Sequence, residues 1–108
     1  MFRSLHTMEE VEQFIENNQL AFLYVTQPHC SVCHGLFPQL VPILDRYRNI
    51  ATAQIDATAV QEAAGQLSLF TAPVALLFVE GKEYLRKARF IPLHELEGEI
   101  AKIYKHYQ

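Results

Sequence analysis

The chain has 108 residues, of which half are hydrophobic, and this length and composition predict a single domain, residues 1–108, with a conventional core. The formal net charge is -3 and Lys and Arg are scattered, which excludes the basic surface that a nucleic acid or an anionic membrane would require. The first ten residues lack an apolar segment of signal-peptide length, and no apolar run approaches a membrane span, so we expect a cytoplasmic protein with no membrane partner.

A helix and a buried strand open the chain. Thr7-x-x-Glu10 is a capping box, in which each side chain bonds the backbone N–H of the other residue, and it predicts a helix over residues 8–17. Residues 20–25 are apolar without alternation, which indicates a strand covered by helices on both sides. A short strand around residues 2–5 is expected to precede this unit.

The middle of the chain predicts a helix, a strand and a second helix. Apolar residues at helical spacing follow the cysteines and predict a helix that its internal prolines should kink. Residues 51–55 predict a short strand ending at Asp56, whose carboxylate we expect to serve as a turn or cap group. Thr58-x-x-Gln61 has the pattern of a second capping box and predicts the start of a short helix.

The last third predicts a hairpin followed by a helix. Residues 74–79 form the most apolar run, and Glu80-Gly81 suits a tight turn into a partner strand at 83–90. Pro92 starts a final helix with one apolar face. Parallel strands joined by crossover helices and followed by an antiparallel hairpin predict an α/β fold.

Two cysteines, Cys30 and Cys33, lie between the apolar strand at 20–25 and the following helix. The N-terminus of a helix has free N–H groups and a partial positive charge, and both stabilise a thiolate. Two intervening residues place the sulfurs one helical turn apart. Because the chain has no other cysteine, a redox pair is a better interpretation than a structural crosslink or two ordinary buried thiols.

The flanking histidines suggest two other kinds of site. Cys30-x-x-Cys33-His34 matches the attachment string of c-type haem, but haem attachment needs export, and the sequence has no export signal. His29 and His34 would add nitrogen ligands for zinc, although four ligands within six residues strain a tetrahedral site. We therefore expect no cofactor and no metal. His29 then either fills the loop or stabilises the Cys30 thiolate, and His34 faces solvent.

The whole pattern resembles the thioredoxin family, over roughly residues 7–105. The resemblance depends on the order of elements, on C-x-x-C after a buried strand, on Pro38 five residues past Cys33, and on Ala72-Pro73 at the start of a strand. It implies a thioredoxin-like three-layer α/β/α sandwich with a mixed central sheet. Within the family, the chain resembles the divergent thioredoxin-like proteins of low-GC Gram-positive bacteria.

The resemblance also implies roles for individual residues. Cys30 would be the exposed nucleophile, Cys33 the buried resolving thiol, and Pro73 the cis-proline that faces the disulfide. The backbone of Ala72 would pair with a substrate polypeptide as an extra strand. The residues beside the thiols would complete the substrate-binding site: His29, Ser31 and Val32.

The chain departs from the family around this site. Thioredoxins have Trp before the first cysteine and Gly-Pro between the two, where this chain has His29 and Ser31-Val32. Tyr24 occupies the position of the family's buried carboxylate, and Arg89 that of the small glycine in the substrate groove. Tyr24 is expected to be a core aromatic residue; the alternative is that its hydroxyl bonds a water near Cys33 in place of the missing carboxylate.

The resemblance predicts a thiol–disulfide oxidoreductase. Its substrate would be a disulfide-containing protein or a low-molecular-weight disulfide, and an unidentified reductase would supply the electrons. The alternative is a non-catalytic binding module with the same fold, which would hold a partner in the groove at Pro73.

Overall fold

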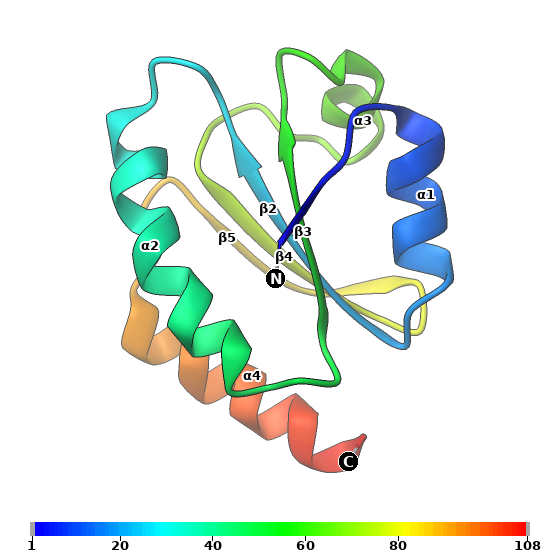
Figure 1. Cartoon of the computed structure of the whole chain (residues 1–108), viewed down its shortest axis with the longest axis vertical. Coiled ribbons are helices and arrows are strands. Elements are labelled where there is room, and N and C mark those ends of the chain that lie inside the picture. Colours follow the sequence, from blue (N-terminus) through cyan, green and yellow to red (C-terminus); the bar gives the residue numbers. More distant parts are fainter. Residues whose placement is uncertain (1, 108) are drawn as a thin grey trace.

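The computed structural model describes residues 2–107 and consists of a mixed sheet with helices on both faces (Figure 1). The elements follow in chain order: β1 (Arg3–Ser4), α1 (Met8–Glu16), β2 (Leu20–Thr26), α2 (Ser31–Asp45), β3 (Ala51–Asp56), α3 (Gln61–Gln66), β4 (Val74–Val79), β5 (Lys82–Ala88) and α4 (Leu93–His106). The strand order across the sheet is β1-β3-β2-β4-β5. β1 and β2 pair with β3 in parallel, whereas β4 is antiparallel to both β2 and β5.

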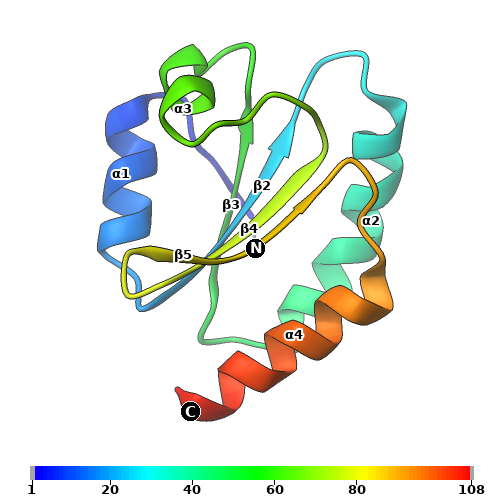
Figure 2. The ribbon, with the colours of Figure 1, turned by 180° about the vertical axis from the view of Figure 1, so that it is seen from behind.

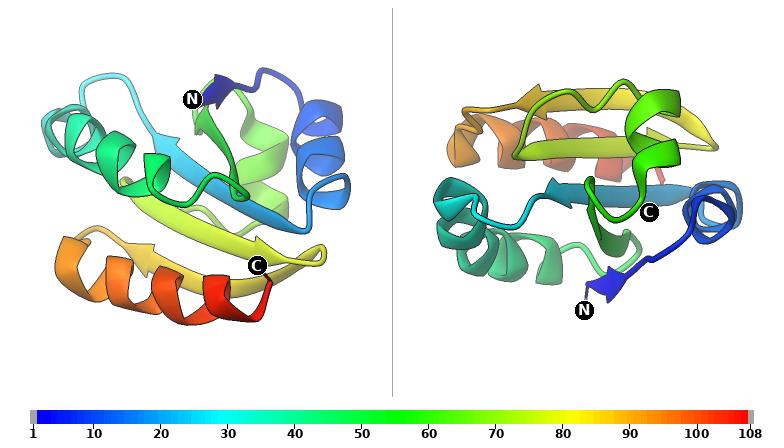
Figure 3. Two further views of the ribbon diagram at one scale, coloured as in Figure 1. Left: turned by 60° about the horizontal axis from the view of Figure 1, so that its bottom comes forward. Right: turned by 90° about the horizontal axis from the view of Figure 1, so that it is seen from above.

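The strands separate two hydrophobic cores. α1 and α3 cover one face, and α2 and α4 cover the other (Figures 2 and 3). Successive residues of β2 point to opposite faces, so Leu23 belongs to the first core and Phe22 to the second. Residues 20–25 are all buried, as the lack of alternation predicted. The three-layer α/β/α sandwich is confirmed.

Local sequence signals account for α1 and for the hairpin. Thr7 Oγ1 accepts a hydrogen bond from the Glu10 N–H at 3.1 Å, and the Glu10 carboxylate accepts one from the Thr7 N–H at 3.2 Å. The capping box is therefore confirmed. Glu80 and Gly81 both have left-handed backbone conformations, with φ of 52° and 83°, which close the tight turn between β4 and β5.

α2 continues past both of its prolines. Cys30 precedes the helix in an extended conformation, and the helix then contains Pro38 and Pro42 before it ends at Asp45. Its buried face includes Leu40 and packs against the second core. The bend expected at the prolines stays a prediction.

Three sequence expectations are wrong in detail. Thr58 does not cap α3, because the carboxylate of Asp56 takes both its N–H, at 2.8 Å, and its hydroxyl, at 2.6 Å. Asp56 is thus the turn residue that was expected. Pro92 is the cap residue before α4 and not its first residue. β5 ends at Ala88, two residues earlier than predicted, because Arg89 has a left-handed φ of 67°.

Within residues 2–107, none of the helices has both the length and the apolar character needed to cross a membrane.

Candidate functional site

Cys30 and Cys33 form a disulfide, with an S–S distance of 2.06 Å. Cys30 is half-buried in the loop that follows β2, whereas Cys33 lies in the first turn of α2 and is 0% exposed. The two sulfurs therefore have different access to solvent. A reagent or substrate approaching from outside meets Cys30 first.

The N-terminus of α2 points at the Cys30 sulfur. Cys30 is the cap residue of the helix, and its Sγ accepts a hydrogen bond from the Cys33 N–H at 3.2 Å. The helix dipole adds a partial positive charge at this end, and the first turn contains no acidic residue to oppose it. When the disulfide is reduced, these groups favour a thiolate at Cys30.

A hollow of about 340 Å³ opens beside Cys30. His29 lines it from an exposed position with a left-handed φ of 46°, and Thr58 lines it from the turn after β3. His29 therefore borders the same hollow as the sulfur. Thr58 was not among the site residues that the sequence suggested, because the helix it precedes is distant from the cysteines along the chain.

The segment before β4 reaches the same end of the sheet. The Ala72–Pro73 peptide bond is cis, as predicted. Val74 pairs with Val25, so Pro73 lies beyond the end of β2 that leads into Cys30. Pro73 is buried and Ala72 is half-buried. The Pro73 carbonyl accepts a hydrogen bond from the Arg89 N–H at 2.8 Å, which joins this segment to the end of β5.

The remaining residues near the thiols face solvent. Ser31 is exposed, and Val32 is 61% exposed between the two cysteines. His34 is also exposed on the outer side of α2, as expected. Among residues 2–107, no group of three or more His, Cys, Asp or Glu side chains is arranged to hold a metal ion.

Tyr24 lies under the first turn of α2. It is 1% exposed, and its hydroxyl donates a 2.7 Å hydrogen bond to the carbonyl oxygen of Cys33. Burial raises the pKa of Tyr24 to about 12, so this hydroxyl remains a neutral donor. The Tyr24 hydroxyl donates a hydrogen bond to a backbone carbonyl, whereas a carboxylate at this position would be able to accept a proton. The core position was predicted, but the bond to Cys33 was not, because it joins two separate elements.

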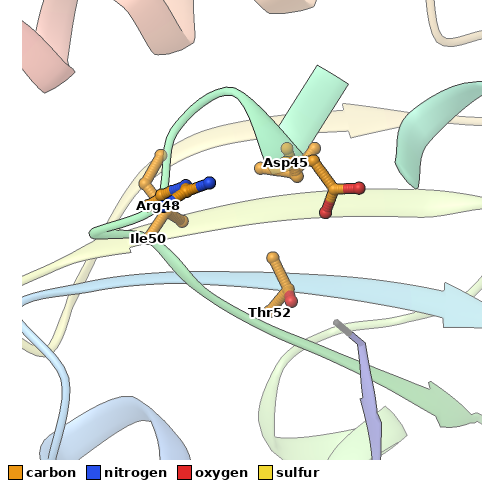
Figure 4. Close-up of a pocket in the computed structure, with 5 residues that line it drawn as sticks. Asp45, Arg48, Ile50 and Thr52 are labelled. Atoms are coloured by element: carbon orange, nitrogen blue, oxygen red, sulfur yellow. The ribbon is translucent and has the colours of Figure 1, made fainter. Parts of the chain in front are cut away.

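A second hollow, of about 350 Å³, lies at the other end of α2. Figure 4 shows Asp45 at the end of the helix, Arg48 and Ile50 on the loop that follows, and Thr52 on β3. At about 1.5 Å rise per residue, the helix separates this hollow from Cys30 by roughly 20 Å. It contains no sulfur, and we assign it no part in thiol chemistry.

Comparisons with known proteins agree on one relationship. A family model described as Thioredoxin matches residues 3–102. The thioredoxin-like protein YdfQ of Bacillus subtilis is 42% identical over 104 residues, which cover 96% of this chain and 93% of that protein. Among solved structures, Fasciola hepatica thioredoxin matches with a TM-score of 0.80 and 21% identity, covering 99% of this chain and 100% of that one. Oxidised mitochondrial thioredoxin 3 of Saccharomyces cerevisiae matches with a TM-score of 0.83 and 17% identity over 94% of each chain.

Proposed function

Since the chain belongs to the thioredoxin family and carries out thiol–disulfide exchange, we propose that Cys30 is the attacking thiol and Cys33 the resolving thiol. The observation that carries this assignment is the difference in exposure: Cys30 is half-buried at the surface, and Cys33 is 0% exposed. The N–H of Cys33 directed at Cys30 Sγ supports it further, because this contact favours the thiolate form of the outer sulfur.

The reaction proceeds in two exchanges. The Cys30 thiolate attacks one sulfur of the target disulfide, whose S–S bond breaks, and the displaced target sulfur leaves as a thiolate and takes up a proton. The Cys33 thiol then loses its proton, its sulfur attacks Cys30 Sγ, and the second target sulfur leaves and is protonated. The target gains two electrons and the chain retains the Cys30–Cys33 disulfide, which an external dithiol or a reductase must reduce before the next cycle.

We further propose that the substrate contacts five residues around this pair. His29, Ser31 and Val32 are supported by their exposure beside the thiols. Ala72 and Pro73 are supported by the strand register, which places them beyond the end of β2 that leads to Cys30. In such an arrangement, Ala72 would act through its backbone N–H and C=O, as an edge that an extended substrate segment can join.

The cellular setting is part of the same proposal. Residues 1–108 would work as one domain, since both cores are built on a single sheet. The cytoplasm suits a dithiol that must be reduced again after each cycle, and the electron donor would be a reductase.

Turnover tests the proposal. Catalytic amounts of the protein should accelerate the reduction of a disulfide-bonded protein such as insulin by dithiothreitol, and Cys30→Ser should abolish the acceleration. Arg48→Ala, at the distant hollow, is the matched control and should retain full activity. Absence of turnover in the wild type, together with partner binding that survives loss of both thiols, would instead support a binding module.

A further inference from the structure

The edge strand β5 contains one extra residue. Phe78 of β4 pairs with Glu83, and the preceding residue of β4 pairs with Leu85. Tyr84, between these two partners, is therefore a β-bulge. In a regular strand, residues three positions apart face opposite sides of the sheet. The bulge instead turns Glu83 and Arg86 to the same side, where they form an ion pair at 2.8 Å.

Arg86 connects this ion pair to the turn that follows α3. Its Nε and Nη2 donate to the Glu83 carboxylate at 2.9 and 2.8 Å, and the same guanidinium donates to the carbonyls of Leu67, at 2.6 Å, and Ser68, at 3.0 Å. The hydrogen bond from Arg86 lowers the pKa of the Glu83 carboxyl, so the pair is charged at neutral pH. Because the carboxylate fixes the planar guanidinium, its other donors point at the two carbonyls.

The backbone at the end of α3 needs such a donor. α3 ends at Gln66, and the last carbonyls of a helix have no donor within the helix. The next turn includes Ser68, whose left-handed φ of 56° is costly for a residue with a side chain and persists only where the surroundings determine it. Arg86 supplies part of that determination from a different element of the fold.

This turn leads to the segment that lies at the dithiol end. Leu69 is 3% exposed in the first core, and its N–H donates to the Ala64 carbonyl at 2.8 Å. The next anchor is the bond from the Arg89 N–H to the Pro73 carbonyl. Within the described chain, the backbone of residues 70–72 makes no hydrogen bond to another backbone group. The position of this segment therefore depends on the anchors on either side of it.

We propose that Arg86 is a positioning residue for the exchange reaction: by holding the turn before residues 70–72, it keeps the backbone of Ala72 where an extended substrate segment joins it. This inference rests on the proposed function, since it concerns how the substrate-pairing edge is held. A polypeptide disulfide uses that edge, whereas a small disulfide without a peptide backbone needs only access to Cys30. Loss of the clamp should weaken polypeptide binding selectively, because the segment must then be ordered during binding.

Steady-state kinetics on two substrates test the proposal. Insulin and hydroxyethyl disulfide are compared, both with dithiothreitol as reductant. Arg86→Gln should raise KM for insulin about fivefold and keep kcat, as well as kcat/KM for hydroxyethyl disulfide, within about twofold of the wild type. Arg86→Lys keeps the charge without the planar fork and should recover part of the loss. Glu83→Gln should raise KM for insulin by a smaller factor.

Arg46→Gln is the matched control. Arg46 also pairs with a glutamate, Glu97, and donates to a backbone carbonyl, that of Pro42 at 3.4 Å, but it lies at the far end of α2. Its replacement should change KM for neither substrate. Amide hydrogen exchange gives a second readout: the Leu69 N–H should exchange faster in Arg86→Gln than in the wild type, and at the wild-type rate in Arg46→Gln.

Three outcomes would overturn the proposal. They are an equal loss on both substrates, a fall in kcat at unchanged KM for insulin, and faster exchange of the Leu69 N–H without any change in KM, since the clamp would then only stabilise the fold. If Arg86→Gln does not fold, Arg86→Lys and Glu83→Gln are judged by the same criteria. Absence of wild-type turnover on both substrates would instead contradict the proposed function itself.

Discussion

The dithiol end of the sheet and its opposite end are formed by the same strands, yet they expose different side chains. At the dithiol end, Val32 is exposed between the two cysteines, and His29 and Thr58 border the hollow beside Cys30. At the opposite end, Asp45 and Arg48 border the hollow of Figure 4. Left-handed residues occur at both ends, at His29 and at Glu80 for example. Unusual backbone therefore does not by itself distinguish the two ends; the disulfide at the start of α2 does.

The largest effect should come from the cysteines, and it should be asymmetric. Cys33→Ser removes the proposed resolving thiol, so stable mixed disulfides between Cys30 and target proteins should accumulate in cells. Cys30→Ser should accumulate almost none, because the remaining sulfur is buried. Non-reducing gels measure both, with adducts that collapse on adding reductant.

Arg48→Ala should give the wild-type adduct pattern, since it changes only the opposite end. Equal trapping by both Ser variants would contradict the division of roles between Cys30 and Cys33. Loss of trapping from a Cys33→Ser protein that also carries Arg48→Ala would break the comparison between the two ends.

A pair of tyrosine variants sharpens the comparison in terms of stability. Tyr24→Phe removes the buried 2.7 Å bond to the Cys33 carbonyl and should cost about 1–3 kcal/mol in the free energy of unfolding, because a buried acceptor loses its donor. Tyr104→Phe removes a 3.4 Å contact with the Asn49 N–H in a solvent-exposed place and should cost less than about 0.5 kcal/mol. Urea titrations of the oxidised proteins measure both. Equal losses of unfolding free energy in the two variants would show that the buried hydroxyl of Tyr24 stabilises the fold no more than an exposed hydroxyl does.

The Cys30 thiolate provides a third comparison. In the reduced protein we expect the pKa of Cys30 to lie below the free-cysteine value of about 8.5, because its sulfur caps α2. His29→Ala should bring the pKa of Cys30 part of the way back, since His29 lines the same hollow. His106→Ala, at the C-terminal end of α4, is the control and should have no effect. The rate of alkylation against pH gives these values, and an unchanged pKa in His29→Ala would remove the tuning role.

The smallest effect concerns Asp56 and its pH dependence. The Thr58 hydroxyl lowers the pKa of the Asp56 carboxyl below its ordinary value of 3.8. A carboxyl group whose pKa is lower in the folded state stabilises the fold at pH values above its unfolded-state pKa. This stabilisation disappears as the pH falls through the folded-state pKa. Thr58→Ala should therefore lower stability at pH 7, and the difference from the wild type should shrink as the pH falls below about 4.

Urea midpoints at several pH values measure this difference. Arg46→Ala supplies the comparison at the other end of α2, where the Arg46 guanidinium lowers the pKa of Glu97. Added salt should weaken the effect of Arg46→Ala, which removes a surface ion pair, more than that of Thr58→Ala, which removes a neutral hydroxyl. A Thr58→Ala effect that is independent of pH would contradict the assigned contact with Asp56.

Much of the fold was determined by local sequence signals. The capping box at Thr7, the unbroken apolar run at 20–25 and the turn at Glu80-Gly81 each depend on residues within a few positions of one another, and the structure has all three. The two errors were also local. Thr58 bonds the nearby Asp56 carboxylate instead of capping α3, and the left-handed backbone of Arg89 ends β5 before the predicted residue.

Other features were decided only by tertiary structure. The hydroxyl of Tyr24 reaches Cys33, and the guanidinium of Arg86 reaches the carbonyl of Leu67, across elements that the sequence alone does not bring together. The exposure of Phe70 and Phe90 has the same origin, because phenyl rings are usually buried and only the tertiary structure shows that these two face solvent. Sequence patterns report the preferences of neighbouring residues, whereas burial and hydrogen-bond partners depend on which distant segments the folded sheet and its helices place side by side.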